Sequence, residues 1–296
     1  MALVFSIKRW QTVLFKINTS KLYAIIAVLM IAIGVVVIYY SISLFLASLH
    51  PARTSTPVRV AQWSGYIITS GTQSSSQLVS GISASWIVPE VKVTENGTFS
   101  AVWIGIGGYG EETLIQTGTE QQCLNGQITY FAWYELLPDY LVRITDMRIR
   151  PGDTITASLS LVDENTRTWS IKISDVTRGG RFEKAVVYDS SRLSAEWIVE
   201  RPTVNGAIST LADFGNVTFS ECEATMEGKT GTIGNFSSTQ LVMYNSENVQ
   251  LVTVSPLSSD GASFTVSYLK PSSSVALSNG LNVFWPVVRA RKALQA

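Results

Sequence analysis

Short β-branched and aromatic runs recur along the chain after residue 62, with turn residues such as Pro151-Gly152-Asp153 and Ser259-Asp260-Gly261 between them. No segment after residue 50 keeps apolar residues at the helical period over three turns, so βαβ units are not expected. The runs expected to be strands are 63–69, 82–88, 99–106, 113–117, 127–136, 154–162, 168–176, 182–188, 195–200, 217–220, 241–244, 249–254 and 263–268. This pattern predicts one large all-β domain, a sandwich or a barrel.

The N-terminal part is of a different kind. Leu22 to Leu49 is a run of 28 residues without a charge, and residues 1–21 before it hold four basic residues and no acid. A helix of that length spans about 42 Å, enough to cross a hydrocarbon core of about 30 Å. A cleaved signal peptide has a shorter apolar region, so we expect an uncleaved anchor, with cleavage near Ala47 as the alternative. The basic flank predicts a cytoplasmic N-terminus and an extracellular domain at the cell membrane.

The chain ends in another distinct segment. Ser272–Ser274 is typical of a linker, and Phe284–Val288 is a short apolar run followed by basic residues. Either a poorly ordered tail or a second contact with the membrane surface is expected there. The predicted organisation is a basic tail at 1–21, a transmembrane helix at 22–49, a linker at 50–62, the β domain at 63–269 and a C-terminal tail at 270–296.

Charge and rare residues exclude several functions. The chain has 22 basic and 22 acidic residues, and without the basic N-terminal flank the rest is net acidic, which argues against nucleic-acid binding. His50 is the one histidine, so the β domain has no Ser-His-Asp or Cys-His pair and no histidine-based zinc site. Cys123 and Cys222 are a poor metal pair, but an oxidising compartment permits a disulfide between them. We expect neither a metal nor another cofactor.

Glycines between Ala101 and Gly118 admit two interpretations. Gly105, Gly107 and Gly110 satisfy the G-x-G-x-x-G fingerprint of dinucleotide-binding proteins. That fingerprint requires a helix directly after it, to hold the pyrophosphate, whereas a strand-like run follows here. The glycines are therefore predicted to form a turn between two strands.

The remaining chemistry belongs to carboxylates and an amide. Glu196 and Glu200 share a face of one predicted strand, and Glu135 shares a face with Trp133 on another. Gln116 lies within a third strand, where a half-buried amide must find partners. Acids in such strands are usually solvated, but three of them beside tryptophans favour a concave polar cleft.

Five segments, in chain order, carry a resemblance to a known family. They are Trp63-Ser64-Gly65, Ala101–Ile106, Leu114–Gly118 (Leu-Ile-Gln-Thr-Gly), Ala132–Glu135 (Ala-Trp-Tyr-Glu) and Glu196–Glu200 (Glu-Trp-Ile-Val-Glu). In this order they resemble the motifs of glutamic peptidases, the eqolisin family of acid-acting endopeptidases. The resemblance covers about residues 60–269, and Gly107 stands where the family has an aspartate.

The resemblance implies a sandwich of two antiparallel, roughly seven-stranded sheets with a substrate groove on one of them. It implies that Gln116 and Glu200 are the catalytic dyad. The residues implied to line the groove are Trp63, Trp103, Trp133, Glu135 and Glu120. Glu196, also in the motif, is implied to be a structural or groove acid.

The expected function is hydrolysis of peptide bonds by water that a glutamate activates, while a glutamine stabilises the oxyanion. The expected partners are a polypeptide substrate and, through the N-terminal helix, a membrane, and the chain is expected to be a monomer. Two alternatives remain open: a non-catalytic sandwich that binds carbohydrate or peptide, and a glycosidase that uses Glu135 and Glu200.

Overall fold

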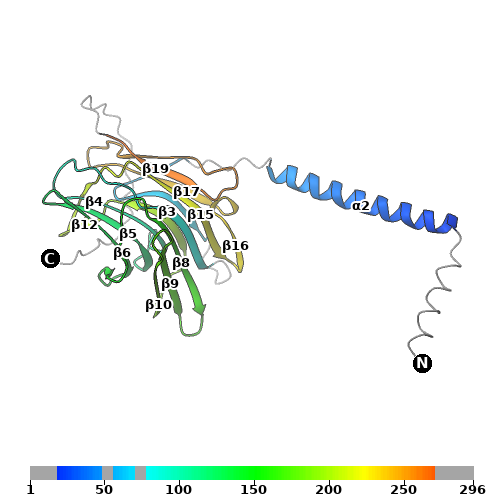
Figure 1. The fold of residues 1–296 in the computed structure, drawn as a ribbon, viewed down its shortest axis with the longest axis horizontal. Helices are drawn as coiled ribbons and strands as arrows, with labels where there is room; N and C mark the ends of the chain where they lie inside the picture. The colour runs from blue at the N-terminus through cyan, green and yellow to red at the C-terminus, as the bar shows by residue number, and fades with distance from the viewer. Residues whose placement is uncertain (1–18, 49–55, 71–77, 271–296) are drawn as a thin grey trace. The chain divides into compact units, whose positions relative to one another are not determined.

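The computed structural model describes residues 19–48, 56–70 and 78–270, in two units, Met1–Thr54 and Ser55–Ala296 (Figure 1). In the first unit, α2 (Thr19–Ser48) is apolar on all sides, and its stretch Leu22–Ser41 has a mean hydropathy of 2.8. This helix is long and apolar enough to cross a membrane, a property that a signal sequence shares. The expected basic tail up to residue 18, the first part of the linker up to residue 55 and the C-terminal tail from residue 271 lie outside the described residues.

The second unit holds two large sheets. The first has nine strands, and all pairs in it are antiparallel except β1 with β17 and β14 with β4. In spatial order these strands are β1 (Val58–Val60), β17 (Ser238–Met243), β2 (Trp63–Thr69), β11 (Ser194–Glu200), β4 (Thr98–Gly107), β5 (Leu114–Leu124), β6 (Gln127–Leu136) and β7 (Val142–Ile144), with β14 (Thr210–Leu211) beside β4.

The second sheet has eight strands, and Figure 1 shows it layered against the first. In spatial order they are β10 (Gly180–Val187), β9 (Thr168–Asp175), β8 (Thr154–Asp163), β3 (Val79–Ile87), β15 (Asn216–Met226), β19 (Phe264–Tyr268) and β18 (Val252–Val254), with β16 (Lys229–Thr232) beside β15. A small hairpin of β12 (Thr203–Val204) and β13 (Ala207–Ile208) follows β11, and a short 3₁₀ helix, η2 (Ile233–Asn235), follows β16.

The main core lies between the two sheets, and alternate residues of each strand point into it. Two buried indoles tie the sheets together: Trp86 on β3 donates to the Thr119 hydroxyl on β5 at 3.1 Å, and Trp197 on β11 donates to the Ser83 carbonyl on β3 at 3.0 Å. Because a buried indole N–H needs an acceptor, these bonds favour one alignment of the sheets. The predicted all-β sandwich is confirmed.

Several details differ from the expectations. β1 lies within the segment 50–62 that was expected to be a linker, and the run at 249–254 forms a strand only at Val252–Val254. The run at 113–117 continues as β5 to Leu124, and the run at 217–220 is the start of the eleven-residue β15. The disulfide that the sequence permits is not formed: Cys123 and Cys222 are free buried thiols, one on each sheet. Burial raises the pKa of the Cys222 thiol far above its ordinary value, so this group stays an unreactive thiol.

Candidate active site

The outward face of the nine-stranded sheet carries a second apolar cluster, separate from the core between the sheets. It includes Trp63, Trp103 and Trp133, the three tryptophans predicted to line a groove. Side chains along a strand alternate between the two faces of a sheet. The pairing of β2, β11, β4, β5 and β6 places all three rings on the same face. The polar residues of the predicted site occur on the same face.

On this face, side chains of the neighbouring strands β11, β4 and β5 form a grid of three rows. β11 contributes Glu200, Ile198 and Glu196, which pair with Ala101, Trp103 and Gly105 of β4. These in turn pair with Glu120, Gly118 and Gln116 of β5. Trp103 is therefore at the centre of the grid. The four corners are the polar residues Glu200, Glu120, Glu196 and Gln116, and the positions between corners are Ala101, Gly118, Gly105 and Ile198. Glu200 and Gln116 are at opposite corners, on either side of Trp103.

Trp103 and Trp63 hold Glu200. The indole N–H of Trp103 donates to Oε2 of Glu200 at 2.7 Å. Trp63 is the β2 residue paired with Glu200, and its ring meets that of Trp103 edge to face, with centroids 5.0 Å apart. Glu200 is only 3% exposed. A charge-assisted bond from a rigid ring thus directs this carboxylate towards the centre of the grid.

Two glycines make room for the central indole. A Cβ on Gly118 would lie 2.2 Å from the Val102 carbonyl oxygen and 2.6 Å from the Cβ of Trp103. A Cβ on Gly105 would lie 2.8 Å from the ring of Trp103. Side chains at these two positions would collide with the indole or with neighbouring backbone atoms. The two glycines therefore allow the Trp103 ring to pack against the surface of the sheet.

Gln116 is fixed from the other side. Its amide nitrogen donates to Oε2 of Glu135 at 2.6 Å, and the two residues pair directly across β5 and β6. The amide presents its NH₂ group to Glu135, and a carboxyl oxygen accepts the bond. Gln116 and Glu135 are 2% and 0% exposed. Glu135 therefore sets the orientation of the amide and accepts one of its two hydrogens.

The sequence contains a signal for this pairing. Asn125 and Gly126 lie between β5 and β6 with φ angles of +51° and +73°, as a two-residue hairpin turn requires. That turn sets the register, which brings Gln116 opposite Glu135. From sequence, Glu135 is expected to be a groove acid or, in the glycosidase alternative, a catalytic acid, and its pairing with Gln116 is not predicted.

The structure places the other predicted residues on the same face. Glu120, at a corner of the grid, accepts from the Gln122 amide at 2.8 Å. Trp133 lies beside Gly118 on β6. At the edge of the sheet, the Arg143 guanidinium lies 3.8 Å over the ring of Phe131. Among the described residues, no group of three or more His, Cys, Asp and Glu side chains could hold a metal ion.

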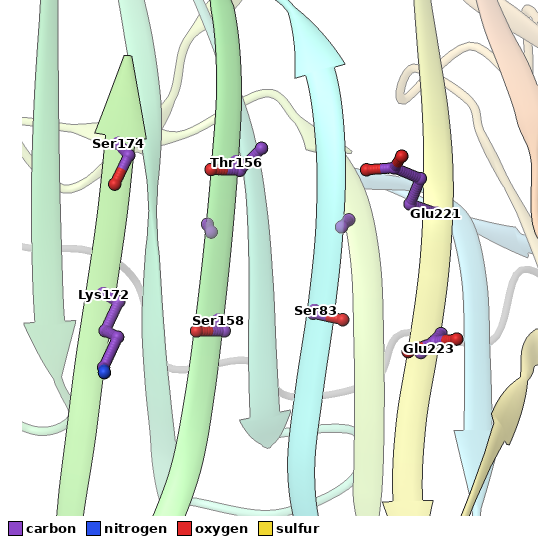
Figure 2. Close-up of a pocket in the computed structure, with 9 residues that line it drawn as sticks. Ser83, Thr156, Ser158, Lys172, Ser174, Glu221 and Glu223 are labelled. Carbon is purple, nitrogen blue, oxygen red and sulfur yellow. The ribbon is translucent and has the colours of Figure 1, made fainter. Parts of the chain in front are cut away.

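A hollow of about 530 Å³ lies on the outer face of the eight-stranded sheet (Figure 2). Hydroxyl groups of Ser83, Thr156, Ser158 and Ser174 form much of its lining, with Lys172 on one side and Glu221 and Glu223 on the other. Lys172 is exposed and ion-paired with Glu183 at 3.0 Å. No aromatic side chain is in that lining, whereas ligand sites commonly have apolar and aromatic walls. The Trp103 grid is the better candidate for the active site.

Comparisons with known proteins agree with the five motifs. The model of the Peptidase A4 family matches residues 61–268. Aspergillopepsin-2 of Aspergillus niger is 34% identical over 175 residues, which are 57% of this chain and 59% of that protein. Scytalidopepsin B of Scytalidium lignicola is 26% identical over 200 residues, 64% of this chain and 72% of that protein. The match therefore spans less than two thirds of Aspergillopepsin-2.

Solved structures share the fold. Scytalido-glutamic peptidase, solved with a transition state analog inhibitor, has a TM-score of 0.60 at 23% identity, over 71% of this chain and 98% of that one. Aspergilloglutamic peptidase from Aspergillus niger has a TM-score of 0.52 at 30% identity, over 58% of this chain and 99% of that one. The glutamic-peptidase resemblance is thereby confirmed, and the chain belongs to the Peptidase A4 family.

Proposed function

We propose that this protein is an acid-acting endopeptidase in which Glu200 activates water and Gln116 stabilises the oxyanion. The observation that carries the proposal is the arrangement around Trp103. A carboxylate fixed by an indole N–H and an amide fixed by Glu135 stand at opposite corners of one grid. Membership of the Peptidase A4 family supports the same reaction.

Glu200 and Gln116 have separate tasks in the proposed reaction. Glu200 takes a proton from water while the water oxygen forms a bond to the carbonyl carbon of the substrate. The negative charge moves to the carbonyl oxygen, which accepts a hydrogen bond from the Gln116 amide. When the C–N bond breaks, the proton held by Glu200 passes to the leaving amine, so the carboxylate is restored. A carboxylate can serve as such a base at acid pH, since carboxyl groups ordinarily have a pKa near 4.

The two alternatives fit the arrangement less well. A glycosidase needs two carboxyl groups facing a common gap about 5–9.5 Å wide. Here Gln116 lies between Glu135 and Glu200 in the order of the strands, and its amide holds the Glu135 carboxyl. A non-catalytic peptide-binding module would use the same aromatic face without turnover, so only an activity measurement separates it from a peptidase.

The direct test is digestion of an acid-denatured protein between pH 2 and 5 by the purified full-length chain in detergent. We expect new peptides, with newly formed amino termini, to accumulate at a rate proportional to enzyme concentration. The control is the same preparation after heat denaturation. Binding of the substrate without any cleavage would contradict the peptidase and favour the binding module.

We further infer that α2 anchors the protein in the cell membrane, with the sandwich outside. The inference rests on the apolar stretch Leu22–Ser41 and the four basic residues that precede it. Protease added to intact cells is expected to degrade the sandwich, while a cytoplasmic marker protein survives. The protein should also sediment with membranes and resist extraction by high salt. Complete protection of residues 63–269 in intact cells would contradict this topology.

A further inference from the structure

The proposed reaction gives no role to two corners of the grid, Glu120 and Glu196, and the more deeply buried of the two is Glu196. It pairs with Ile67 on one side and with Gly105 on the other, and Gln116 follows in the same row. Its side chain is 0% exposed, and neither carboxyl oxygen has a hydrogen-bond partner. Burying a carboxyl group without a partner is costly, so such a group at an active site suggests a function.

The surroundings of Glu196 are apolar and include the central indole. A Cβ on Gly105 would lie 3.3 Å from Oε2 of Glu196, 2.8 Å from the ring of Trp103 and 2.8 Å from a methyl group of Leu114. The Glu196 carboxyl and the Trp103 ring therefore share the space above Gly105. The same ring donates its N–H to Glu200. One rigid side chain thus connects Glu196 with the proposed catalytic base.

The electrostatic surroundings favour the neutral form of Glu196. Burial raises its pKa well above the ordinary value of 4.5. The Ser194 hydroxyl, two residues earlier, is near enough to oppose that rise but does not reach hydrogen-bond geometry. The five strands β2, β11, β4, β5 and β6 contain four glutamates and no basic residue. The other titratable groups on this face and at its rim include Glu120, Glu135, Glu200, Tyr109, Arg143 and Tyr188.

We propose that Glu196 is a positioning residue that works as a neutral carboxylic acid, holds the Trp103 indole against Glu200, and ends the working pH range when it ionises. This role rests on the proposed peptidase function. The Ser194 hydroxyl is the donor near Glu196 and makes no hydrogen bond to it, so an ionised Glu196 side chain must leave the space above Gly105 to reach water. The Trp103 ring then loses the packing that directs its N–H to Glu200.

An acid-acting peptidase of the kind proposed would lose activity towards neutral pH, and the dyad alone does not produce that loss. A carboxylate base stays ionised at every pH above its pKa, and an amide does not titrate. Neither Glu200 nor Gln116 therefore accounts for a loss of activity towards neutral pH. A group that must remain protonated does account for it, and Glu196 is a fully buried acid on the strand of Glu200 and in the row of Gln116.

The test compares pH profiles of kcat and kcat/KM for the full-length wild type and Glu196→Gln, which has the same shape and cannot ionise. Glu196→Gln is expected to keep activity at the acid optimum within about threefold. The pH at which activity falls by half on the alkaline side is expected to rise by at least one unit, through kcat more than through KM. Glu223→Gln, an exposed acid on the other sheet, is the matched control and should leave the profile unchanged.

A second measurement does not depend on catalysis. A raised pKa in the folded state means that the folded chain binds this proton more tightly than the unfolded chain does. The contribution of Glu196 to the free energy of unfolding should therefore be fully present below pH 4.5 and be lost as the pH rises above it, and Glu196→Gln should lack that part of the slope. Should Glu196→Gln not fold, Ser194→Ala replaces it: removing the opposing hydroxyl is expected to move the alkaline limb to higher pH.

The outcomes are distinct. An unchanged alkaline limb in Glu196→Gln, in an active and folded enzyme, would overturn the positioning role and leave the proposed function intact. A wild type without peptidase activity, but with the expected slope in stability, would overturn the proposed function and not the neutral state of Glu196. An altered limb in Glu223→Gln as well would overturn the assignment to this residue.

Discussion

Replacing Glu200 with glutamine is expected to lower kcat of the proposed peptidase by about 10²–10⁴, the usual contribution of a general base. Glutamine keeps the shape of glutamate, and its carbonyl can still accept the bond that Trp103 donates at 2.7 Å. The amide cannot take a proton from water, so the variant retains the geometry and loses the chemistry. KM is expected to change little, because the substituted group acts chiefly in the transition state.

The measurement is single-substrate kinetics between pH 2 and 5 on the full-length chain in detergent, beside thermal unfolding of each variant. Glu223→Gln on the outer face of the eight-stranded sheet removes one carboxylate far from the grid and should leave kcat unchanged. If Glu200→Gln retains more than about a tenth of wild-type kcat, the base is another acid of the same face, Glu196 or Glu135.

How far this site follows from sequence depends on which pairing brings its residues together. The β5–β6 pairing was predictable, since Asn125-Gly126 is a short-range hairpin signal that sets the register over both strands. The alternation of side chains also predicted correctly that Glu196 and Glu200 share a face. These are local properties, which neighbouring residues determine.

The position of β11 between β2 and β4 could not be derived in this way. Glu200 pairs with Trp63 and Ala101, which lie 137 and 99 residues earlier in the chain. No turn or periodicity connects such segments, because long-range strand order is decided by packing of the whole sandwich. The resemblance to glutamic peptidases, and not periodicity, brought Gln116 and Glu200 together in the sequence analysis.

Local patterns also gave an incomplete account of some strands and of the cysteines. β15 continues past Ser220 because a bulge between Ser220 and Glu223 restores its pairing with β3. A change of register within a strand obscures the alternation that identifies it. Cys222 lies within that bulge, and Cys123 lies on the other sheet. An oxidising compartment permits a disulfide, but only the positions of the strands decide whether two cysteines are close enough to form one.

The prediction that best separates the hypotheses concerns Gln116. We expect Gln116→Ala to lower kcat by about 10²–10³, as for loss of one oxyanion donor, with a smaller change in KM. In a glutamic peptidase the amide donates to a charge that develops only in the transition state. A glycosidase has no use for that amide, and a binding module uses it only for affinity. The removal of Gln116 also deprives Glu135 of its 2.6 Å hydrogen bond, so some stability should be lost in every case.

Gln121→Ala provides the control for that structural loss. Gln121 is a fully buried glutamine on the same strand, β5, but it faces the other side of the sheet, where its carbonyl accepts from Ser100 at 3.0 Å. Its replacement should lower the melting temperature about as much as Gln116→Ala does, while kcat stays within about threefold of wild type. If both variants instead lose stability alike and both keep normal kcat at acid pH, Gln116 is only a satisfied strand amide, and the dyad proposed here is wrong despite the family to which the chain belongs.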